Sequence, residues 1–211
     1  MTHFPLRHNR DCVLALHQAY ADKTESVFTG LQNIPGNPYQ VRLQRFGATR
    51  TAIAKGYDWS NRVTLVGDES FDKMEEILAY YAEHHCRCHI EWNPAICYRP
   101  HSWNVELEPY LRERGFRQGG FRCVWHKAAE PTAPLLPPGF TLRHFGPDAL
   151  PEFIDLLMTM ENKDPAQRLE IEHNYLFGQG NSQWHHYIGF QEGTVCSTAT
   201  LFTSGDIGCL E

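Results

Sequence analysis

A proline-rich segment near the middle of the chain constrains the fold more than any other feature. The segment AAEPTAPLLPPGF, residues 128–140, carries four prolines and no polar periodicity. Because proline fixes φ and lacks a backbone donor, such a stretch cannot continue a helix and instead forms a stiff linker or an extended crossover. We therefore divide the chain into a first unit at 1–130, a linker at 131–139 and a second unit at 140–211.

The first unit mixes helical and strand patterns. Apolar residues recur at helical spacing over residues 10–30 and again over 71–84, which predicts two amphipathic helices. Asp68 or Ser70 stands where a side chain could cap the second helix. Short apolar or alternating runs predict five strands, YQVRLQRF, TAIAK, RVTLVG, CHIEWNP and FRCVWHK. One more helix is expected over 105–114.

The second unit begins with a strand, FTLRHF, followed by a helix over 147–160 and a weaker helix over 165–177. Three strands then follow, HHYIGF, TVCSTATLF and DIGCLE, and the Glu192-Gly193 pair between the first two indicates a hairpin. The inward residues of the first helix are predicted to be Leu150, Phe153, Ile154 and Leu157. A third strand with no following element leaves an open edge and an uncovered apolar face, so we expect an incomplete second unit and a homodimer.

The composition narrows the possible partners. Lys and Arg number 19 against 25 Asp and Glu, a formal charge of −6, which argues against nucleic-acid and anionic-membrane partners. No stretch approaches the roughly 18 apolar residues of a membrane span, and the first 20 residues lack a signal-peptide pattern. Seven scattered cysteines, an odd number, favour reduced thiols. A cytoplasmic location is expected.

The second unit resembles the first half of a domain of the GNAT superfamily of acyl-CoA-dependent N-acyltransferases. The resemblance rests on HHYIGFQEGTVCSTATLF and GDIGCLE, an aromatic strand, an acidic-Gly turn, a small-residue strand, a turn and an apolar strand. It implies transfer of an acetyl group from acetyl-CoA, as co-substrate, to a small-molecule or peptide amine. In the family the next strand opens into a Gly-rich loop and a helix that hold the CoA pyrophosphate, so the cofactor-binding residues are expected beyond Glu211.

The first unit is similar to a degenerate GNAT domain placed ahead of an active one. The similarity is carried by NRVTLVGDESFDKMEEILAYYAEHHCRCHIEWNP and LRERGFRQGGFRCVW. At the place of the pyrophosphate loop it has VGDESFD, where Asp68, Glu69 and Asp72 put negative charge on a phosphate position. We therefore expect an α/β protein of two GNAT-like units, with mixed, mostly antiparallel sheets flanked by helices and no CoA site in the first.

The resemblance also assigns site residues. Glu211, at the end of the last strand, lies near the place where a family member admits the pantetheine, and a carboxylate there could take a proton from the amine. Glu161, Asp164 and Glu172 would attract a cationic acceptor, and Tyr175 would add an aromatic wall. The competing interpretations are a solvated terminal Glu, a solvated helix face and a packed tyrosine.

Two other functions stay open on the sequence. A non-catalytic ligand-binding or interaction module on a GNAT scaffold would explain the missing CoA loop. Metal binding is the third, but zinc sites commonly use Cys-x2-Cys pairs and this segment has only Cys-x-Cys, so no metal is expected. The residues concerned are His84, His85, Cys86, Cys88 and His89.

Overall fold

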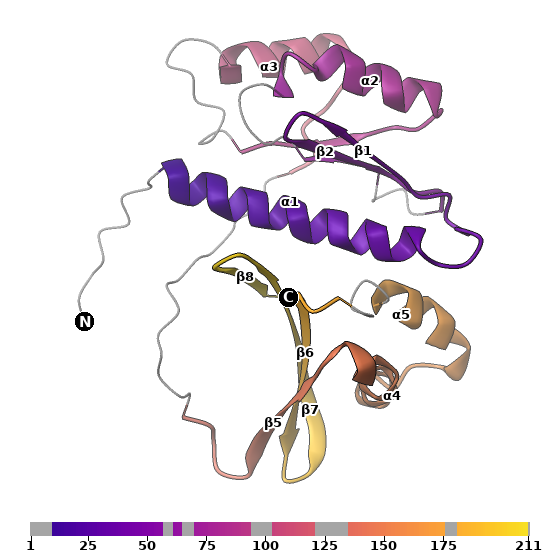
Figure 1. Cartoon of the computed structure of the whole chain (residues 1–211), viewed down its shortest axis with the longest axis vertical. Coiled ribbons are helices and arrows are strands. Elements are labelled where there is room, and N and C mark those ends of the chain that lie inside the picture. Colours follow the sequence, from indigo (N-terminus) through magenta and orange to yellow (C-terminus); the bar gives the residue numbers. More distant parts are fainter. Residues whose placement is uncertain are drawn as a thin grey trace.

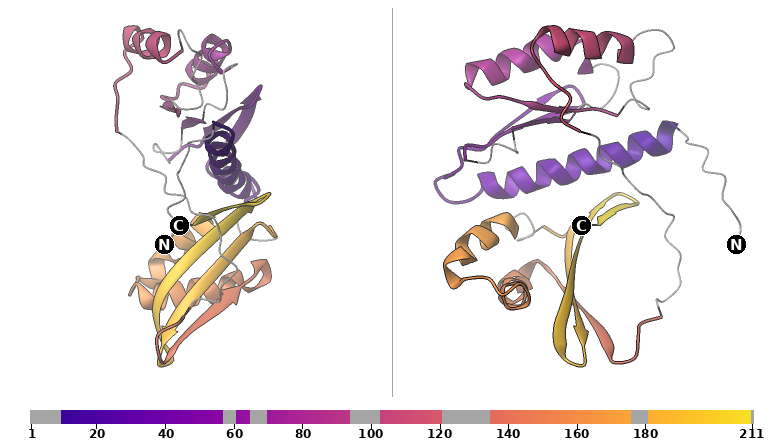
Figure 2. Two further views of the ribbon diagram at one scale, coloured as in Figure 1. Left: turned by 90° about the vertical axis from the view of Figure 1, so that its left-hand side faces the viewer. Right: turned by 180° about the vertical axis from the view of Figure 1, so that it is seen from behind.

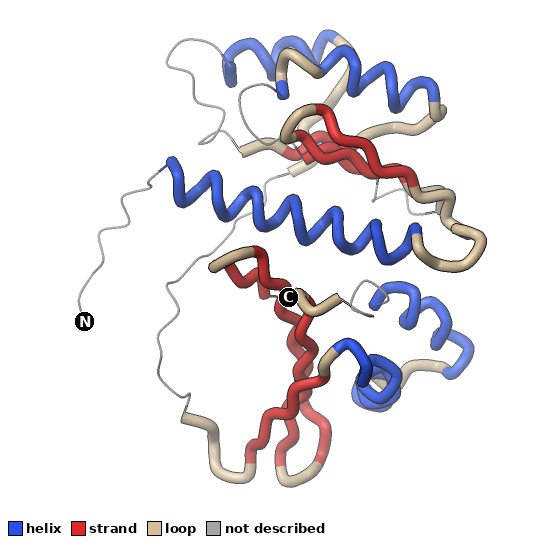
Figure 3. The backbone as a smooth tube through the Cα atoms, in the orientation of Figure 1, coloured by secondary structure: helices blue, strands red, loops and turns tan. Residues whose placement is uncertain are grey.

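The computed structural model describes residues 10–56, 61–64, 70–93, 103–120, 135–175 and 181–210. Within these ranges the chain forms five α-helices and two four-stranded sheets, so the predicted mixed α/β class is confirmed (Figures 1 and 3). The first sheet has the strand order β1-β2-β3-β4 and the second β5-β6-β7-β8.

The elements follow the predicted order. The first part of the chain contains α1 (Arg10–Gln32), β1 (Arg42–Phe46), β2 (Thr49–Ile53), β3 (Arg62–Thr64), α2 (Met74–Glu83), β4 (His89–Glu91) and α3 (Trp103–Glu113). The second part contains β5 (Phe140–Phe145), the 3₁₀ turn η3 (Pro147–Ala149), α4 (Leu150–Met160), the 3₁₀ turn η4 (Pro165–Gln167), α5 (Arg168–Tyr175), β6 (Trp184–Gln191), β7 (Thr194–Ser204) and β8 (Ile207–Leu210). The predicted strand FRCVWHK and Glu211 lie outside the described residues.

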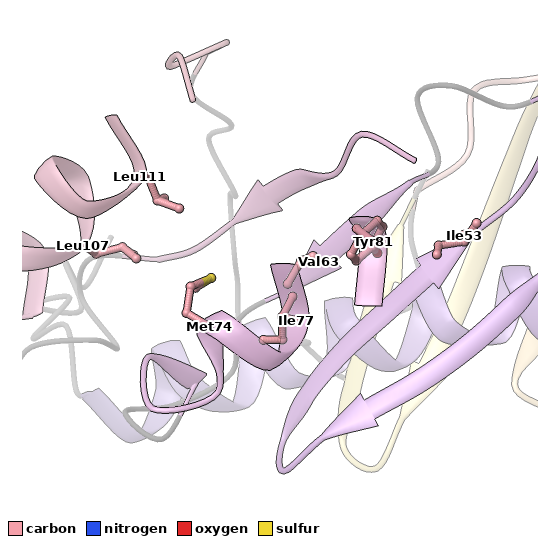
Figure 4. Packing of buried hydrophobic residues seen from close by; sticks show 7 residues of the cluster. All are labelled: Ile53, Val63, Met74, Ile77, Tyr81, Leu107 and Leu111. Atoms are coloured by element: carbon pink, nitrogen blue, oxygen red, sulfur yellow. The ribbon is translucent and has the colours of Figure 1, made fainter. Parts of the chain in front are cut away.

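The first sheet is packed between helices on both faces. Alternate residues of a strand point to opposite faces, so Ala52 packs with Phe28 of α1 while the next residue, Ile53, packs with α2 and α3. Figure 4 shows the second of these clusters, in which Met74, Ile77 and Tyr81 of α2 meet Leu107 and Leu111 of α3. The result is a three-layer arrangement of α1, sheet and the α2–α3 pair (Figure 2).

Strands β3 and β4 are parallel, and α2 is the crossover between them. The residue before α2 is Lys73, and no side chain caps the helix. The predicted capping by Ser70 is wrong, because its hydroxyl is buried and accepts a hydrogen bond of 2.6 Å from Thr49 Oγ1 on β2. Asp68 lies outside the described residues.

The second sheet is entirely antiparallel, and its helices lie on one face. The hairpin between β6 and β7 turns at Glu192 and Gly193, whose φ values of 50° and 81° fit a type I′ turn, as the sequence predicts. The four helix residues predicted to face inward are all buried against the sheet, beside Phe145 and Ile188, and α5 joins the same cluster through Ile171.

Helix α1 contacts the second sheet as well as the first (Figure 1). Ser26 Oγ accepts hydrogen bonds from Trp184 Nε1 at 2.9 Å and from Asn181 Nδ2 at 3.0 Å, and Val27 packs against the Trp184–Phe202 pair. One helix therefore belongs to the packing of both sheets. Among the described residues no helix combines the length and the apolar character that a membrane crossing requires.

Candidate functional site

The acidic residues predicted to attract an amine lie on and around the connection between α4 and α5. Asp164 is the N-cap of η4: its Oδ1 accepts a hydrogen bond of 2.8 Å from the Ala166 amide, and Gln167 Oε1 accepts one from the Asp164 amide. This reciprocal arrangement is a capping box. The carboxylate of Asp164 thus has a structural task at the start of a turn.

The other two carboxylates have nearby cationic partners. Glu161 lies 3.4 Å from Lys163 Nζ, and Glu172 accepts a hydrogen bond of 2.6 Å from Arg168 Nε. Arg168 also contacts Asp155, and this hydrogen bond, with that of Glu172, raises the pKa of the guanidinium. Exposed pairs of this kind contribute little to stability. The segment nevertheless presents partly exposed carboxylates on one side of the second unit.

Tyr175, three residues after Glu172 on α5, packs over the inner face of the second sheet. Its ring centroid is 5.3 Å from that of Phe153 and 5.7 Å from that of His186, both in edge-to-face geometry. It also packs against the Trp184–Phe202 pair below α1. Tyr175 therefore belongs to an aromatic cluster. The cluster includes His186, which the sequence did not predict as a site residue.

His186 is a buried titratable group on β6. Its side chain has no exposed surface, and Nδ1 lies 3.1 Å from Thr200 Oγ1 on β7. Burial, together with the charges of His185 and His144, lowers the pKa of His186 to about 4. The imidazole is consequently neutral at pH 7, and it serves as a hydrogen-bonding partner there and not as a proton acceptor.

Two further histidines lie on the opposite face of the same strands. His144 Nε2 on β5 and His185 Nδ1 on β6 are 3.2 Å apart, and the ring of Tyr187 is 5.0 Å from that of His144. In a hydrogen bond between two imidazoles, one ring nitrogen donates its N–H and the other accepts with its lone pair. We call His144, His185 and His186 the histidine cluster. In the sequence, these histidines lie within two predicted strands, FTLRHF and HHYIGF.

The cysteine–histidine segment of the first unit joins the end of α2 to the short strand β4. Strand β4 begins only at His89, and Cys86 belongs to the helix end, where its amide bonds to the Tyr81 carbonyl. Burial raises the pKa of the Cys88 thiol to about 11, which keeps it protonated. In the part of the chain that the structure describes, no group of three or more His, Cys, Asp or Glu residues is arranged to hold a metal ion.

The start of α2 follows the segment VGDESFD, which the sequence resemblance predicts to lie at the place of a pyrophosphate loop. Glu75 and Glu76 occupy the first turn of this helix. Glu75 accepts hydrogen bonds from Tyr110 Oη at 2.6 Å and from Arg114 at 2.5 Å, and these interactions lower the pKa of its carboxyl group. Ionised carboxylates at a helix N-terminus occupy the region where a phosphate would bind. Of the three acidic residues predicted to oppose a phosphate, Asp68 and Glu69 lie outside the described residues, and Asp72 lies in the turn just before α2.

Comparisons with known proteins add no relative: the chain matches no protein-family model, no curated protein and no solved structure.

Proposed function

We propose that this chain acts in acyl-CoA-dependent N-acyl transfer, moving an acetyl group from acetyl-CoA to an amine. The observation that carries the proposal is the layout of the second unit. Its order β5–α4–α5–β6–β7–β8 forms a sequential antiparallel sheet with both helices packed on one face. This is the strand–helix–helix–hairpin–strand order on which the resemblance to the GNAT superfamily rests.

The proposed reaction joins the amine nitrogen to the acetyl carbon and releases CoA. A base first takes a proton from the ammonium group, and the free amine nitrogen then attacks the thioester carbonyl. The C–N bond forms, the C–S bond breaks, and the leaving thiolate takes up the second proton that the nitrogen loses. Glu211, which follows β8, is the proposed base. Glu161, Asp164 and Glu172 supply negative potential for a cationic amine and Tyr175 an aromatic wall. Acetyl-CoA is the proposed co-substrate, and the described acidic end of α2 does not suit its pyrophosphate.

Assembly and location complete the proposal. Strand β8 is an edge of the second sheet, and Leu210 on this strand exposes 74% of its surface. Exposed strand edges with apolar residues tend to pair. A cytoplasmic homodimer joined at this edge is proposed, and sedimentation that shows only monomer at micromolar concentration would exclude it.

The test measures binding and turnover separately. Isothermal titration with acetyl-CoA should give saturable heat, and thiol release in the presence of ethylamine, lysine or spermidine should require both the amine and acetyl-CoA. Glu172→Gln should raise KM for spermidine more than it lowers kcat, because the charge acts on acceptor binding. Glu113→Gln, an exposed carboxylate on α3, is the matched control. Absence of both acetyl-CoA binding and thiol release would refute the proposal.

A non-catalytic binding module on the same scaffold is the second candidate. The acidic first turn of α2 favours it, because Glu75 and Glu76 oppose a diphosphate at this position. The acetyl-CoA titration distinguishes the two candidates, because an acyltransferase must bind acetyl-CoA and the binding module does not.

A further inference from the structure

A surface pocket of about 350 Å³ lies in the first unit, at the C-terminal end of α2. Three polar residues at its wall come from the region of β1 and β2 and three from the end of α2; these are Gln40, Arg42 and Lys55, and Glu83, His84 and His85. Helix α2 has ten residues, so the pocket is about 15 Å from the acidic first turn discussed above. The pocket is therefore separate from the position of the pyrophosphate loop.

The charged groups of this pocket are not paired with each other. In the part of the chain that the structure describes, Arg42, Lys55 and Glu83 make no side-chain hydrogen bond or ion pair. Other arginines of the same sheet are engaged, for example Arg45 with Glu25 at 2.5 Å and Arg50 with the same carboxylate at 3.0 Å. Two cations and one carboxylate, all solvent-exposed, thus share a concave surface and are not engaged by other side chains of the described chain.

The backbone at the pocket adopts a conformation that its side chains do not favour. Gln40 and His85 have φ values of 49° and 54°, in the left-handed region. His85 follows the last turn of α2, where its amide bonds to the Ala82 carbonyl and the Cys86 amide to the Tyr81 carbonyl. Glycine is the usual residue at this position of a helix end. Such strain concentrates at functional sites because the surrounding structure must maintain it.

The adjacent histidine is held in one orientation. His84 Nδ1 lies 2.8 Å from the Tyr80 carbonyl oxygen, and since that oxygen only accepts, Nδ1 carries a proton. The ring of His84 also lies against that of Tyr80, with centroids 4.6 Å apart. Below these polar groups the pocket reaches the buried side chain of Ile53. The wall is thus polar and ordered, and part of the floor is apolar.

We propose that this pocket binds a small zwitterion of the α-amino-acid class. Arg42 and Lys55 are suited to a carboxylate, which both side chains bind by charge-assisted hydrogen bonds. Glu83 and the negative end of the α2 dipole are suited to the ammonium group. A simple anion would meet Glu83 and the helix dipole unfavourably, whereas a zwitterion complements both signs. Small-ligand pockets begin at about 300 Å³, so the volume suits a molecule of this size.

The experiment is an NMR titration of the full chain with L-alanine, following the ring protons of His84 and His85. Saturable shifts of both rings are expected. Propionate and ethylamine, which each carry one of the two charges, should bind at least about tenfold more weakly. Arg42→Gln and Glu83→Gln should each weaken alanine binding by about tenfold or more. Arg87→Gln is the matched control, because Arg87 is exposed on the same connection and does not line the pocket.

Two results would overturn the proposal. One is the absence of a saturable shift of either ring up to about 20 mM alanine, beyond the millimolar range expected for a weak specific site. The other is propionate binding as tightly as alanine, which would make the pocket an anion site. Both use the unmutated protein, so they decide the question even if a variant fails to fold. The acetyl-CoA titration is a separate readout, and this proposal does not depend on its result.

Discussion

The two sheets differ in how they are covered. The first is buried on both faces, by α1 on one side and by α2 and α3 on the other, and four of the five β2 residues are buried. The second is covered by α4 and α5 on one face only, so His144 and Leu142 of β5 stay exposed on the other. The burial of the first sheet is greatest at its inner strand β2, whereas β1 at its edge has no buried residue. The uncovered face of the second sheet carries the His144–His185 pair.

The largest expected effect tests how the two sheets are joined. Trp184→Ala should lower the free energy of unfolding by about 3–5 kcal/mol, because it opens a cavity between α1 and the second sheet and removes the donor to Ser26. Urea unfolding followed by circular dichroism measures the change. Leu210→Ala, on an exposed residue of the same sheet, should change stability by less than about 0.5 kcal/mol. A Trp184→Ala protein as stable as the parent would show that α1 belongs to the first sheet alone.

The next prediction concerns the fully covered sheet. Tyr81 Oη lies 2.9 Å from the Ala52 carbonyl oxygen and 2.8 Å from that of Arg62, so it ties α2 to β2 and β3. Tyr81→Phe should cost about 2 kcal/mol, because buried carbonyl groups lose their donor. Tyr187→Phe, on the outer face of the second sheet, should cost less than about 0.5 kcal/mol. Equal costs for the two substitutions in urea unfolding would contradict the contrast between the sheets.

The third prediction concerns pH and His186. Its folded pKa of about 4 is below the usual 6.5, so the unfolded chain binds the proton first as the pH falls. The part of the unfolding free energy that depends on neutral His186 is present above pH 6.5 and is lost between about pH 6.5 and 4.

Unfolding free energies measured at pH 7 and at pH 4.5 check this prediction. His186→Asn should flatten the pH dependence over that window, since asparagine does not titrate. His89→Asn, which removes an exposed histidine of β4, should leave it unchanged. An unaltered slope in His186→Asn would mean that another group controls the loss of stability in acid.

The smallest effect is expected at the end of α2. His85→Gly should raise the free energy of unfolding by about 0.5–1 kcal/mol, because glycine adopts a φ of 54° without strain. Thermal unfolding of the two proteins at one pH measures the gain. A destabilised variant would show that the His85 side chain contributes contacts worth more than the strain.

Local patterns predicted most of the fold. Helix and strand periods depend on neighbouring residues, so the inward set of α4, Leu150, Phe153, Ile154 and Leu157, follows from the sequence alone. The capping by Ser70 failed because a residue 21 positions away, Thr49, takes up its hydroxyl. A competing partner from another element is invisible to a local rule.

In the candidate site, too, contacts between residues close in sequence could be predicted and contacts between distant residues could not. The partners of Glu161 and Glu172, Lys163 and Arg168, lie within four residues, so their pairing could be read from spacing. His144 and His185 are 41 residues apart and meet only because β5 and β6 pair in one particular register. A single sequence does not supply that register, which is why the histidine cluster went unrecognised.

The double role of α1 has a consequence for synthesis on the ribosome. Ser26 leaves the ribosome 158 residues before its partner Trp184. At a translation rate of roughly 5–20 residues per second, Trp184 is synthesised roughly 8–30 s after Ser26. During that time the far side of α1, with Val27, stays uncovered on the nascent chain, although β1 and β2 can already cover Phe28. We expect chaperones to meet the emerging protein on this side of the helix.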